Sequence, residues 1–513
     1  PIKKNKILFL LSARRTYIDL LAKPLMKKQD NQLGYFFYDI NGKINYIINY
    51  RNKLYLSAYV GKDKFNMLQI GTDENNEKTI NRSNITWGNA TTTLRWNHLI
   101  NEKMFSNISL IFTDFLFDIG FEDEADNETT KLHYFSGIRD YSLKGDIDFY
   151  PNTRHTIKTG LLSTYHYFRP NAVVLNSESN TSANVKKITH IDTYENNIYA
   201  EDDYKISEKW RVNAGLRLSN FNVRSKSYFN LEPRISLKYT IKKDFSVKAS
   251  YASMNQYLHL LSNSGIGLPS DLWVPATDKI KPQASQQIAT GLVKDLQIEK
   301  ENFSVSLEGY YKKSKDIIGY KEGASFISVN NVNTQTAANF TYEDIVTAGN
   351  AESYGVEFFL QKKTGRYTGW VGYTLSWTWL TFNELNFGKR FPARYDRRHD
   401  ISIVQMYKLN DHITLSAIWV YGTGNSITLP VSSYQIAPPT SPYKPISIPE
   451  SAIKNGYYLS DNYPSVYDYG SMNNIRMPAY HRLDIAIQFH KKKKKYERVF
   501  EVGIYNAYNR KKP

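Results

Sequence analysis

The clearest alternation of apolar and polar residues lies near the end of the chain, in Arg476–Arg510. One set of alternate positions is apolar: Leu483, Ile485, Ile487 and Phe489. The intervening positions are mostly polar: Arg482, Asp484, Ala486 and Gln488. Because successive side chains of a strand point to opposite faces, this period of two predicts a β-strand with one apolar face. With tyrosines at its ends and a lysine turn after it, the strand is typical of one that crosses an outer-membrane bilayer.

This unit recurs along the whole chain, and the spacers between the runs alternate between short and long. Lys363–Arg366 is the clearest short turn, and Gly422–Asn474 is the longest spacer. Outer-membrane barrels have short periplasmic turns and long external loops. The pattern therefore predicts about nineteen antiparallel strands, with Lys363–Arg366 and Lys491–Lys495 at the periplasmic rim and Gly422–Asn474 outside the cell.

The bulk composition favours one membrane domain over residues 1–513. Aromatic residues make up 14% of the chain, including 40 tyrosines, although the mean hydropathy is −0.51. No apolar run approaches the roughly 20 residues of a membrane helix. A closed barrel is the other structure that satisfies every backbone polar group in lipid. The expected fold class is therefore all-β, a transmembrane antiparallel β-barrel.

The chain is basic, with a formal charge of +17 from 66 Lys and Arg against 49 Asp and Glu. Nucleic-acid binding is one explanation of such a charge, but no recognition motif accompanies it. The basic residues collect at turns such as Lys242–Lys243, where anionic lipid attracts them. We therefore expect outer-membrane lipid, and not nucleic acid, as the partner.

No motif for catalysis or metal binding accompanies the strands. HExxH, GxSxG, the P-loop and the Rossmann fingerprint are missing, so we expect no enzyme, no cofactor and no metal site. The cluster Arg394–Asp400 is interpreted as a charge network at the start of a strand, with an acid–base site as the alternative. Phe121–Glu128 is interpreted as a solvated acidic loop, with Ca²⁺ binding as the alternative.

Candidate ligand contacts lie on the polar faces and in the longest spacer. The polar-face candidates, which would line a charged interior, are Arg211, Arg217, Arg482 and Asp484. The spacer candidates, which would stack on a sugar or an aromatic chelate, are Tyr463 and Tyr467. Packing against neighbouring segments or a partner is the alternative role for these tyrosines.

Four segments resemble the barrel portion of TonB-dependent outer-membrane receptors of the Bacteroidota. They are FLLSARRTYIDLL (Phe9–Leu21), PARYDRRHDISIV (Pro392–Val404), YGTGNSITLP (Tyr421–Pro430) and MPAYHRLDIAI with NAYNRKKP near the end. The resemblance implies a multi-pass protein of the bacterial outer membrane, with 22 strands and a plug that couples to TonB. It also implies energised uptake of a large or scarce nutrient, such as a siderophore, a glycan or a peptide.

The family pattern extends beyond this chain, which begins PIKKNK without a signal peptide. We expect the plug with its TonB contact, the first strands and the last strand to lie outside residues 1–513. The alternative function is a non-transporting barrel scaffold in a larger outer-membrane complex, with a surface lipoprotein over its loops. An outer-membrane enzyme would need a catalytic dyad that the sequence does not offer.

The lipid-facing assignment of the last strands can be tested with two neighbouring substitutions. Ile485→Arg should cost about 2–4 kcal/mol of folding free energy because it places a charge in lipid. Asp484→Asn should leave folding nearly intact because its side chain stays on the polar side. Heat-modifiable mobility and outer-membrane abundance of the full-length variants report the difference. Equal tolerance of both substitutions would contradict the assignment, since a one-residue slip exchanges the two faces.

Overall fold

The computed structural model describes residues 6–21, 31–72, 78–125, 128–177, 185–261, 272–322, 341–435, 465–494 and 496–511. Nearly all of these residues lie in antiparallel strands, which confirms the expected all-β fold class. The described part holds twenty main-sheet strands, of which nineteen have eight or more residues, and six short strands in three pairs. Within the same ranges, no helix is both long and apolar enough to span a bilayer.

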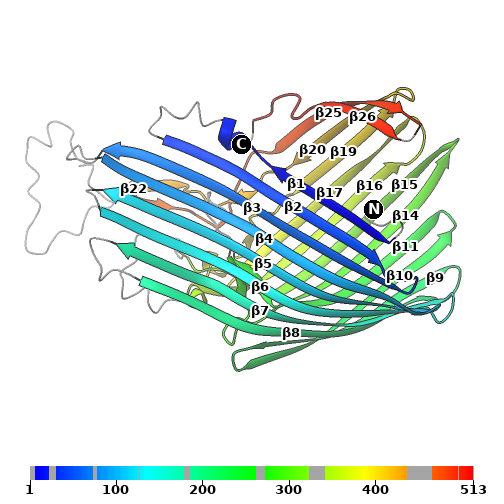
Figure 1. Ribbon diagram of the computed structural model, residues 1–513, viewed down its shortest axis with the longest axis horizontal. Helices are drawn as coiled ribbons and strands as arrows, with labels where there is room; N and C mark the ends of the chain where they lie inside the picture. Colours follow the sequence, from blue (N-terminus) through cyan, green and yellow to red (C-terminus); the bar gives the residue numbers. More distant parts are fainter. Residues whose placement is uncertain are drawn as a thin grey trace, which may run out of the picture. The chain divides into compact units, whose positions relative to one another are not determined.

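The first of two compact units contains β1 to β13, most of β14 and β15, and the start of β16. Each strand from β1 to β11 pairs with the next one along the chain, and β11 pairs with β14. Figure 1 shows β2 to β8 side by side in chain order. The bounds are β1 Ile7–Arg15, β2 Asn31–Ile47, β3 Asn52–Thr72, β4 Lys78–Asn101, β5 Met104–Ala125, β6 Glu128–Phe149, β7 His155–Ser177, β8 Val185–Lys205, β9 Trp210–Val223, β10 Lys226–Lys242, β11 Phe245–Gln256, β12 Leu258–Leu261, β13 Leu272–Pro275, β14 Gln283–Ile298, β15 Glu301–Tyr320, the 3₁₀ turn η3 Tyr342–Asp344 and β16 Val346–Lys362.

The second unit contains the rest of β16 and the elements that follow it. Its pairings run β17–β19–β20–β25–β26, and the two-residue β18 also pairs with β17. The bounds are β17 Tyr367–Phe382, η4 Asn386–Gly388, β18 Phe391–Pro392, β19 His399–Lys408, β20 Ile413–Gly422, β21 Ser426–Ile427, β22 Ser432–Gln435, β23 Ser465–Asp468, β24 Ile475–Arg476, β25 Tyr480–Lys492 and β26 Glu497–Ile504.

Apolar side chains gather on one face of the first unit, in rows that cross from strand to strand. One row is Leu56, Leu94, Leu110 and Leu143, which are directly paired and between 40% and 56% exposed. Exposed leucines in continuous rows are a liability in water but match the hydrocarbon of a bilayer. We call this the apolar face and the opposite side the polar face.

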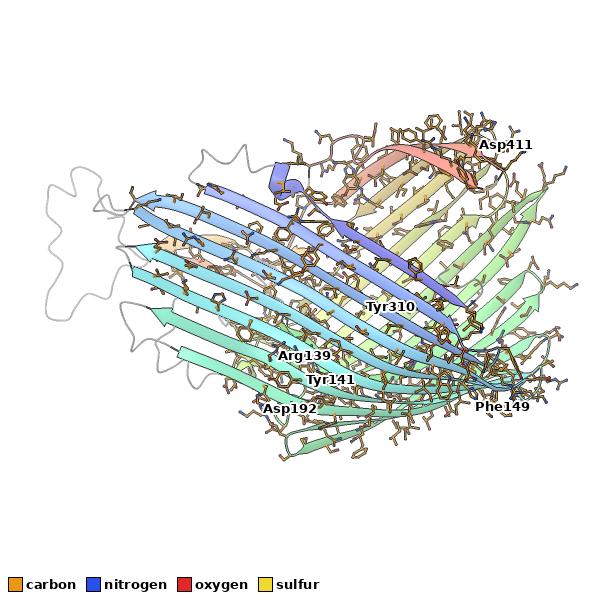
Figure 2. All side chains as sticks on the ribbon, viewed as in Figure 1. Arg139, Tyr141, Phe149, Asp192, Tyr310 and Asp411 are labelled. Carbon is orange, nitrogen blue, oxygen red and sulfur yellow. The ribbon has the colours of Figure 1, made fainter. Side chains whose placement is uncertain are left out.

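Rows of aromatic rings bound the apolar face at two levels along the strands. The row nearer the long connections is Phe112, Tyr141, Tyr165 and Tyr194, with neighbouring centroids 5.1–6.3 Å apart. Figure 2 shows Tyr141 part of the way along β6, well away from Phe149 at the end of that strand. On β8, Tyr204 follows Tyr194 by ten residues. At about 3.4 Å per residue and a tilt of about 45°, the two levels are about 24 Å apart, close to the thickness of an outer-membrane apolar band.

The second unit repeats this division of faces in the strands that the sequence singled out. Ile485 lies between Ala417 on β20 and Ile504 on β26, and its side chain is 41% exposed. Ile487 likewise lies between Leu415 and Val502. The alternation therefore places the predicted apolar residues on one face, with Asp484 on the other.

The strands start and stop close to the predicted short turns but extend further at the other end. β16 ends at Lys362 and β17 begins at Tyr367, which confirms the turn at Lys363–Arg366. The loop predicted at Phe121–Glu128 is wrong, because β5 continues to Ala125 and β6 begins at Glu128. Its acidic residues are held in the sheet by cross-strand ion pairs: Arg82 lies 2.9 Å from Glu122 and 3.1 Å from Glu124.

The cluster Arg394–Asp400 forms a charge network between two connections of the second unit. The carboxylate of Asp396, of which 1% is exposed, pairs with Arg398 at 3.3 Å and with Arg476 at 2.5 Å. It also accepts a hydrogen bond from the backbone N–H of Thr378 at 2.7 Å. This geometry agrees with the interpretation as a charge network, because every group around the carboxylate holds it in place.

Candidate ligand-binding wall

The two arginines predicted on β9 share the polar face of the first unit but have separate partners. Arg211 makes two hydrogen bonds to Asp203, at 2.5 and 2.8 Å, and its side chain is 60% exposed. Arg217 lies further along the strand, donates to the Asn197 side chain at 3.0 Å and lies 3.5 Å from Glu195. Both arginines are therefore held by carboxylates of β8 at different points along the strand, and they do not form one site.

The predicted residues of β25 lie together. Arg482 lies 2.9 Å from Asp484, and its guanidinium stacks over the ring of Tyr505 at 4.2 Å. Asp484 also accepts a hydrogen bond from the backbone N–H of Asn506 at 2.9 Å. This pair fastens β25 to the segment after β26.

The two predicted tyrosines lie in the longest connection of the second unit. Tyr467 belongs to β23, which pairs with β22, and is 54% exposed. Tyr463 lies outside the described residues. An exposed ring on a short hairpin is available for stacking, so the role of Tyr467 as a ligand contact stays a prediction.

A polar network that no motif marks lies on the polar face around Arg217. The ring Nδ1 of His166 lies 2.7 Å from Asp140, and its Nε2 lies 3.7 Å from Glu195. Glu195 in turn contacts Arg217, which lies 4.0 Å from Glu232. The Glu232 side chain is 3% exposed and accepts a hydrogen bond from Ser219 at 2.9 Å. Buried charges require such partners, so the network fixes the positions of these side chains. We call the polar face of the first unit, with the side chains that it carries, the wall.

A short hairpin, β12–β13, covers this network from the polar side. Its residues Leu261, Leu272 and Val274 are at most 1% exposed, in one apolar cluster with Phe168 and Phe221. β13 packs against β6 and β7. Each fully buried aliphatic side chain contributes about 1.5–3 kcal/mol, so these three hold the hairpin with roughly 6 kcal/mol. The hairpin is therefore part of the wall.

Hydrogen bonds and two ion pairs hold the segments on both sides of this hairpin in place. The ring of Tyr257 stacks on Phe221 with centroids 4.7 Å apart, and its hydroxyl lies 2.7 Å from Ser219. After the hairpin, Arg224 lies 2.9 Å from Asp278 and 3.0 Å from Glu343. Arg224 adopts φ 50°, a left-handed conformation that is strained for a residue with a side chain. The ion pairs offset this strain by joining three connections.

Beside the covered network, aromatic side chains occupy the polar face of β3, β4 and β5. Ile85, Phe117 and Ile119 form the buried centre, at 4% exposure or less. Partly exposed rings pack against them: Phe65, Trp87, Phe115 and Phe121. We call this set the aromatic ledge. It was not predicted from the sequence, although Phe115, Phe117 and Phe121 at alternate positions of β5 are a signal for it.

These features offer non-covalent binding chemistry. Rings on a polar wall stack on planar or apolar groups, and the charges around them select by sign. Among the described residues, no group of three or more His, Asp or Glu is placed to hold a metal ion. What the wall presents to a ligand is therefore aromatic surface and hydrogen bonds.

The wall and the two-faced sheet agree with the comparisons to known proteins. The family model described as "TonB dependent receptor-like, beta-barrel" matches residues 18–507, and the chain belongs to this family. Members of the family are outer-membrane receptors and transporters, not enzymes, and contact TonB through a plug. No curated protein matches the chain in sequence.

Solved structures of iron receptors share this fold. The ferric-catecholate import receptor Fiu of E. coli K12 is 12% identical with a TM-score of 0.59, covering 99% of this chain and 74% of that chain. The ferric yersiniabactin uptake receptor FyuA of Yersinia pestis is 10% identical with a TM-score of 0.59, covering 99% and 71%. The FrpB iron transporter of Neisseria meningitidis is 11% identical with a TM-score of 0.53, covering 95% and 78%. At these identities the likeness concerns the fold alone.

The hairpin should loosen in acid because of His259. Burial lowers the pKa of this imidazole to about 4, although Nε2–H donates to the Lys281 carbonyl at 3.1 Å. When the hairpin leaves its docked position, the His259 imidazole regains its ordinary pKa. It is therefore protonated at a higher pH in the undocked state than in the docked state. Docking is therefore fully stable above pH 6.5 and loses up to about 3 kcal/mol as the pH falls to 4.

Hydrogen exchange of the amides in Leu258–Leu261, corrected for the intrinsic rate at each pH, measures this effect. Protection should fall between pH 7 and pH 5 while β4 and β5 keep theirs. His259→Gln removes the titrating group and should abolish the difference between the two pH values. An equal loss of protection in His259→Gln would contradict the role of this imidazole.

Proposed function

We propose that residues 1–513 form the outer-membrane barrel of a TonB-coupled receptor that imports a large or scarce nutrient. The observation that carries the proposal is the pair of opposed faces in the first unit. One face is an exposed apolar band about 24 Å tall. The other carries the aromatic ledge and the polar network. A wall of this kind is built for lipid on one side and for a hydrated ligand path on the other.

Metal chelates are the substrate class that we favour. The named solved structures belong to receptors or transporters of ferric chelates or iron. Ferric chelates are large and often aromatic, so they suit stacking on rings such as Phe65 and Trp87. A glycan or a peptide is the competing substrate, and a surface lipoprotein over the loops and an origin in the Bacteroidota stay predictions.

In this proposal the short turns face the periplasm and the long connections face the outside. The aromatic ledge then lies on the outer side of the membrane band, where an incoming ligand first meets the wall. A plug outside residues 1–513 would contact TonB and open the path. The polar network and the hairpin would narrow the path beside the ledge.

Uptake by cells that produce the full-length protein tests the proposal. Radioactive iron should accumulate when it is supplied as a ferric chelate, and a protonophore or loss of TonB should stop this. Combined Phe65→Ala and Trp87→Ala should raise the half-saturating concentration about tenfold, at about 1 kcal/mol or less per ring. Leu94→Ala, on the apolar face, is the matched control and should leave it unchanged.

Measurements with labelled oligosaccharides and peptides run in parallel and identify the substrate class. TonB-dependent accumulation of an oligosaccharide or a peptide in place of iron would overturn the metal-chelate assignment. Failure of all three ligand classes to accumulate would overturn import itself.

A further inference from the structure

One carboxylate on the polar face of the first unit is surrounded by aromatic rings. Asp63 of β3 pairs directly with Phe37 on β2 and with Trp87 on β4, so both rings share its face. Phe65, two residues along β3, points to the same side. Directly paired residues have Cβ atoms about 4.5–5.5 Å apart, so these rings flank the carboxylate closely.

Two tyrosines complete this setting. The hydroxyl of Tyr35 donates a hydrogen bond to Asp63 at 2.7 Å, and the Tyr35 and Phe37 centroids lie 6.4 Å apart. The phenol of Tyr59 lies over Gly61, and a Cβ at position 61 would collide with it. Glycine at position 61 therefore leaves room for a further ring near Asp63.

Asp63 has no cation of its own among the residues that the structure describes. Arg14, the guanidinium on the polar face of β1, is engaged elsewhere: it lies 2.7 Å from Asp39 and 4.9 Å from the Phe37 centroid. Lys62 and Lys64 are neighbours in sequence but point to the opposite face of β3. By contrast, Asp203, Asp146 and Asp148 on the same polar face each have a basic partner within 4 Å.

The site lies on the side of β3 that leads to a long connection, and it is open. The aromatic row at Tyr141 aligns through Phe112 and Thr92 with Ala58 on β3. Asp63 lies five residues further, or about 17 Å along the strand. The Tyr35 side of the site is accessible, since this residue is 36% exposed.

We propose that Asp63, Tyr35, Phe65 and Trp87 form a binding site for an organic cation, such as an alkylammonium group on the ligand. A carboxylate supplies the opposite charge, and ring faces within about 6 Å attract the cation further. This proposal rests on the proposed function, because it implies that part of the imported molecule is positively charged. Its ligand binds without any covalent step.

Tetramethylammonium chloride is the probe, titrated into the full-length protein in detergent and followed by saturation-transfer NMR. Binding in the millimolar range is expected, with no binding of the neutral analogue tert-butanol. Asp63→Asn should weaken binding at least tenfold. Asp148→Asn removes a carboxylate of the same face that is paired with Lys158, and should change nothing.

Trp87→Leu provides a second variant in case Asp63→Asn does not fold. It keeps an apolar side chain at this position, removes a ring and should weaken binding several-fold. Equal affinities of wild-type, Asp63→Asn and Trp87→Leu protein would overturn the site, as would equal binding of tert-butanol. Binding of tetramethylammonium without any uptake supports the site and contradicts the import function. Uptake of a ligand without binding of tetramethylammonium supports the import function and contradicts the site.

Discussion

The pairing of backbone groups between neighbouring strands is the constraint on which this structure depends. In hydrocarbon an unpaired N–H or C=O costs several kcal/mol, so a chain that crosses lipid as strands must pair each strand on both sides. The pairing from β2 to β9 meets this requirement within the first unit, with register shifts at Leu99–Asn101, Phe135–Gly137 and Phe168–Asn171. Once the register is set, every second side chain is assigned to lipid and the others to the polar side.

This assignment explains which features could be predicted from the sequence. Alternation at Leu483 to Phe489 and the turn at Lys363–Arg366 are local signals, because period and turn chemistry are properties of short segments. The class of fold and nineteen long strands follow from repeating those signals. The resemblance added the family, which the match over residues 18–507 supports.

Other features depend on contacts between distant residues and were missed. β5 extends through the acidic run because Arg82 on β4 pairs with Glu122 and Glu124, a contact 40 residues away or more. The hairpin β12–β13 gave no signal, since its burial comes from Phe168 and Phe221 on other strands. Of the predicted site residues, Arg482 and Asp484 lie together, whereas Arg211 and Arg217 are tied to separate carboxylates.

The division of faces also relates the parts of the proposed mechanism. The apolar face fixes the level of the membrane, and that level places the aromatic ledge beyond the outer aromatic row. Rings on the polar face are poorly hydrated, so a ligand that covers them gains free energy. The β12–β13 hairpin is held by apolar burial, and Arg224 holds the segment after it, so in the proposed mechanism the hairpin stays in place beside the ligand path.

Nitroxide scanning of β8 tests the central claim, that lipid and water lie on opposite sides of each strand. Single cysteines for labelling can be placed without background, since the chain has none. In the full-length protein in liposomes, labels at Ile198 and Ala200 should collide mainly with oxygen, and labels at Tyr199 and Glu201 mainly with a water-soluble nickel chelate. The same preference at all four positions, or the opposite alternation, would contradict the account.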